Sequence, residues 1–214
     1  MGFSDSDIIS LYLEELYWLT SSIKTNTEKI FQDAKVPEKG YVIQVNPEIH
    51  SLIKSVIDEA AQLKNMLMPR ERIGGESEEE RRFRKERGAL LTSLFDSIDI
   101  SEILKDDVRN AMEHFDERLD RLSFTVRKNK WKKDQLIAYN LVISDRTVYS
   151  KFPNPIRIYV STEKKFYLFG LVLDLGKIRD ESGKMLEILN KDPRKNKNLD
   201  PDGLLLRIPK QTKP

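Results

Sequence analysis

Apolar residues recur at spacings of three and four along most of the chain, which is the period of helices that bury one face. This pattern predicts helices over residues 5–34, 47–67, 77–98, 101–122 and about 174–189. Between the last two helices the period changes. Short runs rich in β-branched and aromatic residues, typical of strands, occupy residues 136–143, 156–160 and 166–172. The last two runs predict a hairpin joined through residues 161–165.

The residues that flank these stretches support the helix boundaries. Asn46 is a natural helix cap, and Pro47 suits the first helical position. Pro69 ends the same helix, because proline cannot continue the hydrogen-bond ladder. Ser77 followed by Glu80 matches a capping box at the start of the next helix.

These elements predict a mainly α protein, an antiparallel helical bundle with a small antiparallel β attachment near the C-terminus. Residues 1–125 would form the bundle. Residues 126–190 would form a basic loop, a β-hairpin region and a final helix that packs on the bundle. Residues 191–214 would form a mobile basic tail.

Composition narrows the chemistry that the chain can perform. With 37 Lys and Arg against 35 Asp and Glu, the net charge of +2 is too small to indicate nucleic-acid binding, so any basic surface must be local. The absence of Cys excludes thiolate nucleophiles and Cys-based zinc sites, and it fits a reducing cytoplasm. No apolar run is long enough to span a bilayer, so we expect no membrane association.

The two histidines are His50 and His114, so one subunit cannot supply a multi-His metal site, and we expect no cofactor. His50 falls in the first turn of its helix, and we interpret it as a structural surface or interface residue. His114 follows Arg109 and Asn110 after four and three intervening residues. Histidine suits proton transfer near neutral pH, and arginine presents a planar fork of donors to phosphate.

The order of Arg109, Asn110 and His114 in a late helix resembles the motif of the HEPN family (higher eukaryote and prokaryote nucleotide-binding). In that motif an Arg, usually followed by Asn, His or Asp, precedes a His by four to six residues. The continuation from Glu113 to Leu119 is also similar to many members. The resemblance covers roughly residues 1–125, so the expected bundle is HEPN-like.

The resemblance implies a homodimeric, metal-independent endoribonuclease of a toxin–antitoxin or phage-defence system. His114 would be the general base or acid, Arg109 would stabilise the transition state, and Asn110 would position the substrate. The implied partners are RNA, a second copy of the chain and an antitoxin or other protein. One toxin branch carries a Tyr two residues after the His that its partner nucleotidylates. Asp116 stands there in this chain, so that regulation is not expected.

Helix geometry makes one copy of the motif a poor site. Each residue of a straight helix turns the side-chain direction by about 100°, so Asn110 and His114 share a face. Arg109 and His114 diverge by roughly 140° unless the helix is distorted. A two-fold dimer eases this problem, because two copies of the motif can meet across one cleft.

Alternative interpretations stay open for each basic cluster. Arg109 could pair with Glu113, and His114 could border the core. Cationic residues on the third helix could be a solvated face paired with its glutamates or a ridge that meets RNA; these are Arg81, Arg82, Arg84, Lys85 and Arg87. A basic segment with one indole could be a solubilising loop or an RNA-contacting loop; it comprises Arg127, Lys128, Lys130, Trp131, Lys132 and Lys133.

Two other functions remain open beside the ribonuclease. One is a non-catalytic HEPN-like module that binds nucleotide, RNA or a partner protein in the same groove. The other is an assembly protein whose function lies in the β-rich part and the tail. Toxicity that depends on His114 would favour the enzyme, and harmless expression with a stable partner would favour the module.

Overall fold

The computed structural model describes residues 6–34, 37, 41, 43–128, 137–149, 151 and 153–194. Six α-helices lie in this part of the chain: α1 (Ser6–Asp33), α2 (Pro47–Leu67), α3 (Glu78–Ser93), α4 (Asp107–Glu113), α5 (Phe115–Arg127) and α6 (Leu175–Lys191). The strands are β1 (Ile43–Val45), β2 (Ile137–Ile143), β3 (Asn154–Val160), β4 (Lys165–Leu168) and β5 (Leu171–Asp174). A short 3₁₀ turn, η1 (Arg146–Val148), follows β2. Helix α6 confirms the predicted final helix.

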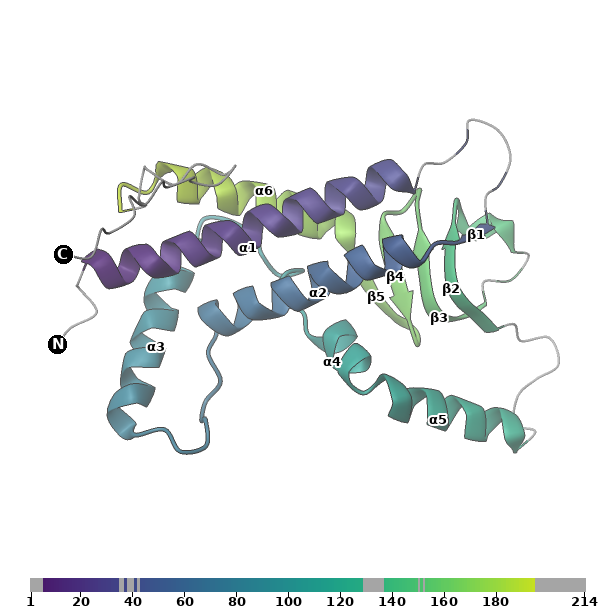
Figure 1. Cartoon of the computed structure of the whole chain (residues 1–214), viewed down its shortest axis with the longest axis horizontal. Coiled ribbons are helices and arrows are strands. Elements are labelled where there is room, and N and C mark those ends of the chain that lie inside the picture. The colour runs from purple at the N-terminus through teal and green to yellow at the C-terminus, as the bar shows by residue number, and fades with distance from the viewer. Residues whose placement is uncertain are drawn as a thin grey trace, which may run out of the picture.

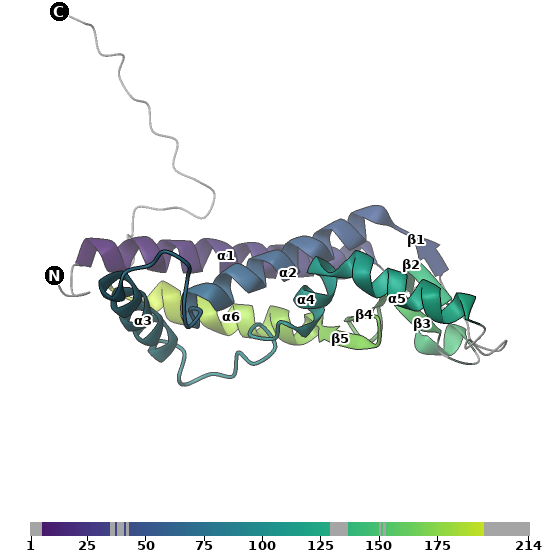
Figure 2. The same cartoon turned by 90° about the horizontal axis from the view of Figure 1, so that it is seen from below.

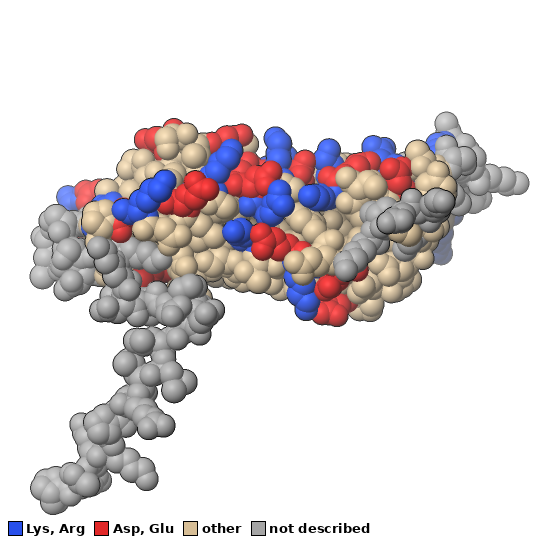
Figure 3. All heavy atoms as spheres, turned by 90° about the horizontal axis from the view of Figure 1, so that it is seen from above, with Lys and Arg blue, Asp and Glu red and all other residues tan. Residues whose placement is uncertain are grey.

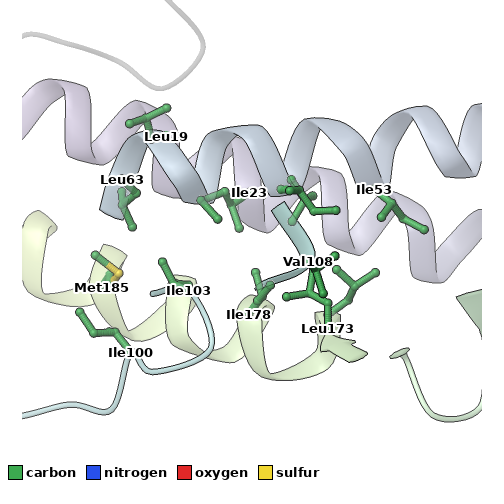
Figure 4. Close-up of a cluster of buried hydrophobic side chains, with 14 of the residues drawn as sticks. Leu19, Ile23, Ile53, Leu63, Ile100, Ile103, Val108, Leu173, Ile178 and Met185 are labelled. Atoms are coloured by element: carbon green, nitrogen blue, oxygen red, sulfur yellow. The ribbon is translucent and has the colours of Figure 1, made fainter. Parts of the chain in front are cut away.

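Three long helices form the body of the molecule. Helices α1, α2 and α6 lie side by side, with α3 at one end and the sheet at the other (Figures 1 and 2). Their apolar stripes face one another, as the spacing of three and four predicts. Figure 4 shows this core, where Ile23 of α1 and Ile178 of α6 meet Val108 of α4 and Leu173 of β5. Each of these four side chains is buried.

The predicted starts of α2 and α3 are confirmed, whereas the helix predicted from residue 101 begins at Asp107. The Oδ1 atom of Asn46 accepts a hydrogen bond from the amide of Ile49 at 3.2 Å, and Pro47 stands at the first position of α2. Ser77 and Glu80 form a complete capping box at the start of α3. Such local side-chain bonds satisfy amides that the helix leaves unpaired, so they act wherever the sequence places them.

The sheet contradicts the predicted fold class. Its strand order is β1-β2-β3-β4-β5, and β2 and β3 pair in parallel from Ile137 opposite Asn154 to Ile143 opposite Val160. The other neighbours pair antiparallel. The expected small antiparallel attachment is therefore wrong: the chain combines its helices with a five-stranded mixed sheet. Strand β1, which joins this sheet, comes from between α1 and α2 and is too short to show an alternating pattern.

The predicted hairpin of residues 156–172 is confirmed in part. Strands β3 and β4 pair antiparallel, but the run predicted as one strand over residues 166–172 is divided into β4 and β5. The division falls at Phe169 and Gly170, whose φ angles are +48° and +85°. Two adjacent residues with positive φ form the tight turn that matches strand twist, and glycine adopts that conformation without steric cost.

Two buried glutamates join helix α6 to the loop before α4. The carboxylate of Glu181 accepts hydrogen bonds from the amides of Glu102 at 3.1 Å and Ile103 at 2.9 Å. Glu102 in turn accepts from the amide of Asp174 at 2.8 Å and from Lys105 at 2.6 Å. Both carboxylates are thus buried with partners, as buried charges require. Burial raises the pKa of Glu181, although these two amides act in the opposite direction.

Among the described helices, none combines the length and the apolar character needed to cross a bilayer.

Candidate functional site

The segment with the Arg-Asn-His motif consists of two helices that meet at the histidine. One helix was predicted over residues 101–122, but α4 ends at Glu113 and α5 begins at Phe115. His114 lies between them with φ −103° and ψ 37°, outside the helical range. The amide of His114 bonds to the carbonyl of Asn110 at 3.1 Å and the amide of Arg118 bonds to the carbonyl of His114 at 3.2 Å, so His114 links the two helices although the regular helix is interrupted there.

Carboxylates one helical turn away contact both Arg109 and His114. The guanidinium of Arg109 donates to Oε1 of Glu113 at 2.7 Å, which confirms the alternative that these two residues pair. The Nδ1 atom of His114 lies 3.2 Å from Oε1 of Glu117. The His114 side chain is 61% exposed, so the alternative that it borders the core is wrong.

Within one chain the motif residues do not converge. Asn110 is exposed, and no hydrogen bond in the described part of the chain joins its side chain to Arg109 or His114. Arg109 is less exposed than His114 and lies against a small hollow that Ile57 of α2 and Val108 also line. A single copy therefore presents one exposed imidazole and one guanidinium, each held by its own glutamate.

The predicted RNA-binding loop falls largely outside the described residues. Arg127 and Lys128 are described at the end of α5, and both are exposed. The Lys128 ammonium lies 5.3 Å from the centre of the Phe124 ring, a favourable cation–π position. The rest of the predicted loop lies outside the described part: Lys130, Trp131, Lys132 and Lys133.

Three of the five cations of helix α3 are paired with carboxylates. Arg81 bonds to Glu71 at 2.6 Å and to Glu78 of the first turn at 3.3 Å, Arg84 bonds to Glu76 at 2.6 Å, and Lys85 shares Glu71. Glu71 and Glu76 belong to the loop before α3, so the expected pairing with the first turn of the helix is confirmed only for Glu78. Arg82 is exposed, and the guanidinium of Arg87 lies 5.2 Å from the centre of the Tyr12 ring. Figure 3 shows the same balance over α1 and α6, where positive and negative side chains alternate. Paired cations of this kind offer little field for phosphates.

A second polar cluster, which was not predicted, lies where α2 meets the sheet. A hollow of about 340 Å³ is lined by His50 and Lys54 of α2, Met112 of α4, Arg157 of β3 and Phe166 of β4. His50 was interpreted as a structural surface or interface residue; its side chain is half-buried, and both ring nitrogens are buried without a hydrogen bond of regular geometry. The Nε of Arg157 and the Oδ1 of Asn140 are also buried without a partner.

Burial controls the ionisation of this histidine. It lowers the pKa of His50 to about 4; a weak hydrogen bond with the backbone of Asn140 opposes this lowering, and the positive charge of Arg157 adds to it. His50 is therefore neutral at pH 7. A buried polar group without a partner costs about 1–3 kcal/mol, so a cluster of four such atoms calls for an explanation.

The backbone is irregular at the same place. Asn140 and Arg157 have φ angles of +54° and +90°, and they fall between the regular strand pairs Tyr139–Ile156 and Leu141–Ile158. The register of β3 against β4 also shifts at this point. A positive φ is rare for arginine and costs on the order of 1–3 kcal/mol, and such strain concentrates at ligand-binding and active sites.

Weak signals of this cluster exist in the sequence. Asn140 interrupts the apolar run of residues 137–143, and Arg157 interrupts that of residues 156–160. Polar residues in strand interiors are ordinary on a solvent-facing side, so only the tertiary structure shows that they approach His50. No group of three His, Asp or Glu side chains suited to a metal ion occurs within the described ranges.

Comparisons with known proteins add no further evidence on this site. No family profile, no curated protein and no solved structure matches the chain.

Proposed function

We propose that the protein is a homodimeric, metal-independent endoribonuclease whose site combines Arg109, Asn110 and His114 from two copies. The observation that carries the proposal is the pair formed by His114 and Glu117. A carboxylate 3.2 Å from Nδ1 favours the tautomer with the proton on that nitrogen. The Nε2 atom then remains as the acceptor of a proton. The resemblance of the motif to that of HEPN ribonucleases supports the same roles.

The chemistry requires a base, an acid and a positive charge. In the base role, Nε2 of one His114 takes the proton of a ribose 2′-hydroxyl, whose oxygen attacks the adjacent phosphorus. The bond from phosphorus to the 5′-oxygen breaks, and that oxygen takes a proton from the second His114. Arg109 stabilises the charge on the phosphoryl oxygens through its fork of donors. The products carry a 2′,3′-cyclic phosphate and a 5′-hydroxyl.

The exposed apolar side of α5 supports the second copy. None of the residues of α5 is buried, although its apolar positions follow the period of a helix with one apolar face. Val126 continues the stripe of Leu119 and Leu122 and is exposed, and Phe124, on the opposite side of the helix, is 61% exposed. A two-fold partner that packs on this stripe with its axis near the start of α5 would bring a second His114 near the first.

Cleavage of RNA by the purified full chain tests the proposal. Wild type should cut total RNA or tRNA in the presence of a chelator and leave cyclic phosphate ends. His114→Ala and Arg109→Ala should each lose about 10²-fold or more in rate, the contribution typical of a proton-transfer residue. Arg121→Ala, an exposed arginine of the same segment, should cleave normally. Cleavage that survives both substitutions, or that the chelator abolishes, would contradict the proposal.

Glu117 acts here as a positioning residue. Glu117→Gln keeps the size of the side chain but replaces the carboxylate beside Nδ1 of His114 with a neutral and weaker acceptor. The cleavage rate should fall while RNA binding is retained, because the ring is no longer held in the tautomer that leaves Nε2 free. An unchanged rate would remove Glu117 from the mechanism. In a cell, toxicity on expression that requires His114 would support a toxin or phage-defence role.

The second candidate is a non-catalytic module that binds nucleotide, RNA or a protein. The ion pairs favour it, because Arg109 and His114 already have carboxylate partners within the chain. RNA binding without cleavage, weakened by Arg109→Ala, would select this function. A stable partner protein and harmless expression would point to the same class.

A further inference from the structure

The hollow between α2 and the sheet has no role in the proposed ribonuclease. It is lined by side chains from α2, α4, β3 and β4, and none of its lining residues belongs to the Arg109–Asn110–His114 motif. Its volume of about 340 Å³ lies at the lower end of the range for small-molecule sites. A single phosphate or sulfate ion would leave most of that space empty.

The charges of the lining favour an anion. Arg157 and Lys54 line the hollow, and no carboxylate does so. Lys54 is paired with Asp58, one turn further along α2 and outside the lining. Arg157 has no ion pair within the described part of the chain, and its guanidinium stacks on Phe115 at 4.0 Å from the ring centre. Stacking holds the planar guanidinium in place and leaves its edge to bind an anion such as phosphate through two parallel donors.

The rest of the lining favours a ligand larger than a simple anion. Phe166 and Met112 contribute apolar walls, and the Phe166 ring already meets the His50 ring edge to face at 6.2 Å. Such walls suit a flat heterocycle.

We infer that this hollow, which is lined by Arg157, Lys54, His50, Phe166 and Met112, is a binding site for a nucleoside monophosphate. The phosphate lies against Arg157 and Lys54. The base lies against the rings of His50 and Phe166. The strained backbone at Arg157 holds its side chain in place for this ligand, since such strain concentrates at ligand-binding sites.

Calorimetric titration of the full-length protein tests the site. The probes are the four common nucleoside monophosphates, adenosine and inorganic phosphate. At least one monophosphate should bind with a dissociation constant below about 1 mM, and adenosine and phosphate should each bind at least about tenfold more weakly. Binding of phosphate alone, or of none of the probes, would overturn the inference.

Variants and a local probe connect binding to this place. Arg157→Gln and His50→Gln should each weaken binding about tenfold or more, whereas the control Arg121→Gln should leave it unchanged. Because a substitution at a strained position can disturb folding, the wild-type methyl signal of Met112 gives an independent readout by NMR. It should shift during the titration, with its assignment taken from Met112→Leu. Binding without a Met112 shift would place the ligand elsewhere and refute the site.

The two proposals fail independently. Loss of RNA cleavage in His114→Ala with nucleotide binding retained would support both. Absent cleavage in wild type with normal nucleotide binding would refute the ribonuclease alone, and normal cleavage without nucleotide binding would refute the hollow alone.

Discussion

The motif segment and the hollow beside it are two polar clusters with opposite environments. At the junction of α4 and α5, Arg109 and His114 lie toward the surface, and each has a carboxylate partner. Beside the hollow, His50, Asn140 and Arg157 carry buried polar atoms without a regular hydrogen bond. The two clusters are close neighbours, since Met112 and Phe115 of the motif segment contact the hollow or its arginine.

The difference separates two kinds of evidence for function. An exposed ion pair contributes little to stability, so its presence neither requires nor excludes a function. A buried unpaired group lowers stability, and a protein with a small stability margin keeps it only when something else compensates. The sequence pattern therefore supports a functional role for the motif. The free-energy cost of the unpaired buried atoms supports a functional role for the hollow.

Removal of a buried group that does have partners should have the largest effect on stability and gives a reference for the comparison. Glu181→Ala leaves the buried amides of Glu102 and Ile103 without their acceptor, so the free energy of unfolding should fall by about 3 kcal/mol. Denaturation in urea measures this change. The control Glu187→Ala, on the exposed side of α6, should change it by less than about 0.5 kcal/mol. Equal effects would show that the buried carboxylate is not a structural centre.

The pH dependence of stability should come next in size and tests the burial of His50. Its pKa is about 4 in the folded protein against 6.5 for an unperturbed histidine. The folded state therefore favours the neutral ring, and this contribution to stability is present above about pH 6.5 and is lost as the pH falls toward 4. The loss is at most about 3 kcal/mol, since one pKa unit corresponds to 1.36 kcal/mol.

This pH dependence is tested by measuring the free energy of unfolding of wild type and of His50→Leu at several pH values between 7 and 4. Titration of the other acidic groups is common to both proteins and cancels in the difference. Between pH 7 and pH 4 the free energy of unfolding of wild type should fall by up to about 3 kcal/mol more than that of His50→Leu. Parallel curves would show that the His50 ring is accessible to protons in the folded state.

The motif itself should have the smallest effect on stability. His114→Ala removes an exposed pair with Glu117, so the free energy of unfolding should change by less than about 0.5 kcal/mol, as measured by urea denaturation. A loss above about 2 kcal/mol would mean that His114 has a structural role, and the environments of the two clusters would then be less different than the structure indicates.

Local patterns allowed much of the helical part to be predicted. The spacing of Ile49, Ile53 and Val56 gave the buried face of α2, and Asn46 with Pro47 gave its start. The capping box of Ser77 and the strands of the β3–β4 hairpin are equally local. These features depend on residues a few positions apart, which the sequence displays directly.

The sheet and the hollow were not predictable in this way. Strand β1 is three residues long and pairs with β2 almost a hundred positions later, and no periodic signal reports such a pairing. The parallel register of β2 and β3 was missed for the same reason. The bend at His114 was also missed, because the apolar spacing continues across it from Ala111 to Phe115.

By itself the sequence determined the helices, their caps, the strand-rich segment and the one short motif whose chemistry can be named. Only the tertiary structure decided which polar residues share an environment. It separated Arg109 from His114 and brought His50 together with Asn140 and Arg157 from distant strands. The physical reason is that helix and strand periods arise from neighbouring residues, whereas burial and the loss of hydrogen-bond partners arise when remote segments pack together.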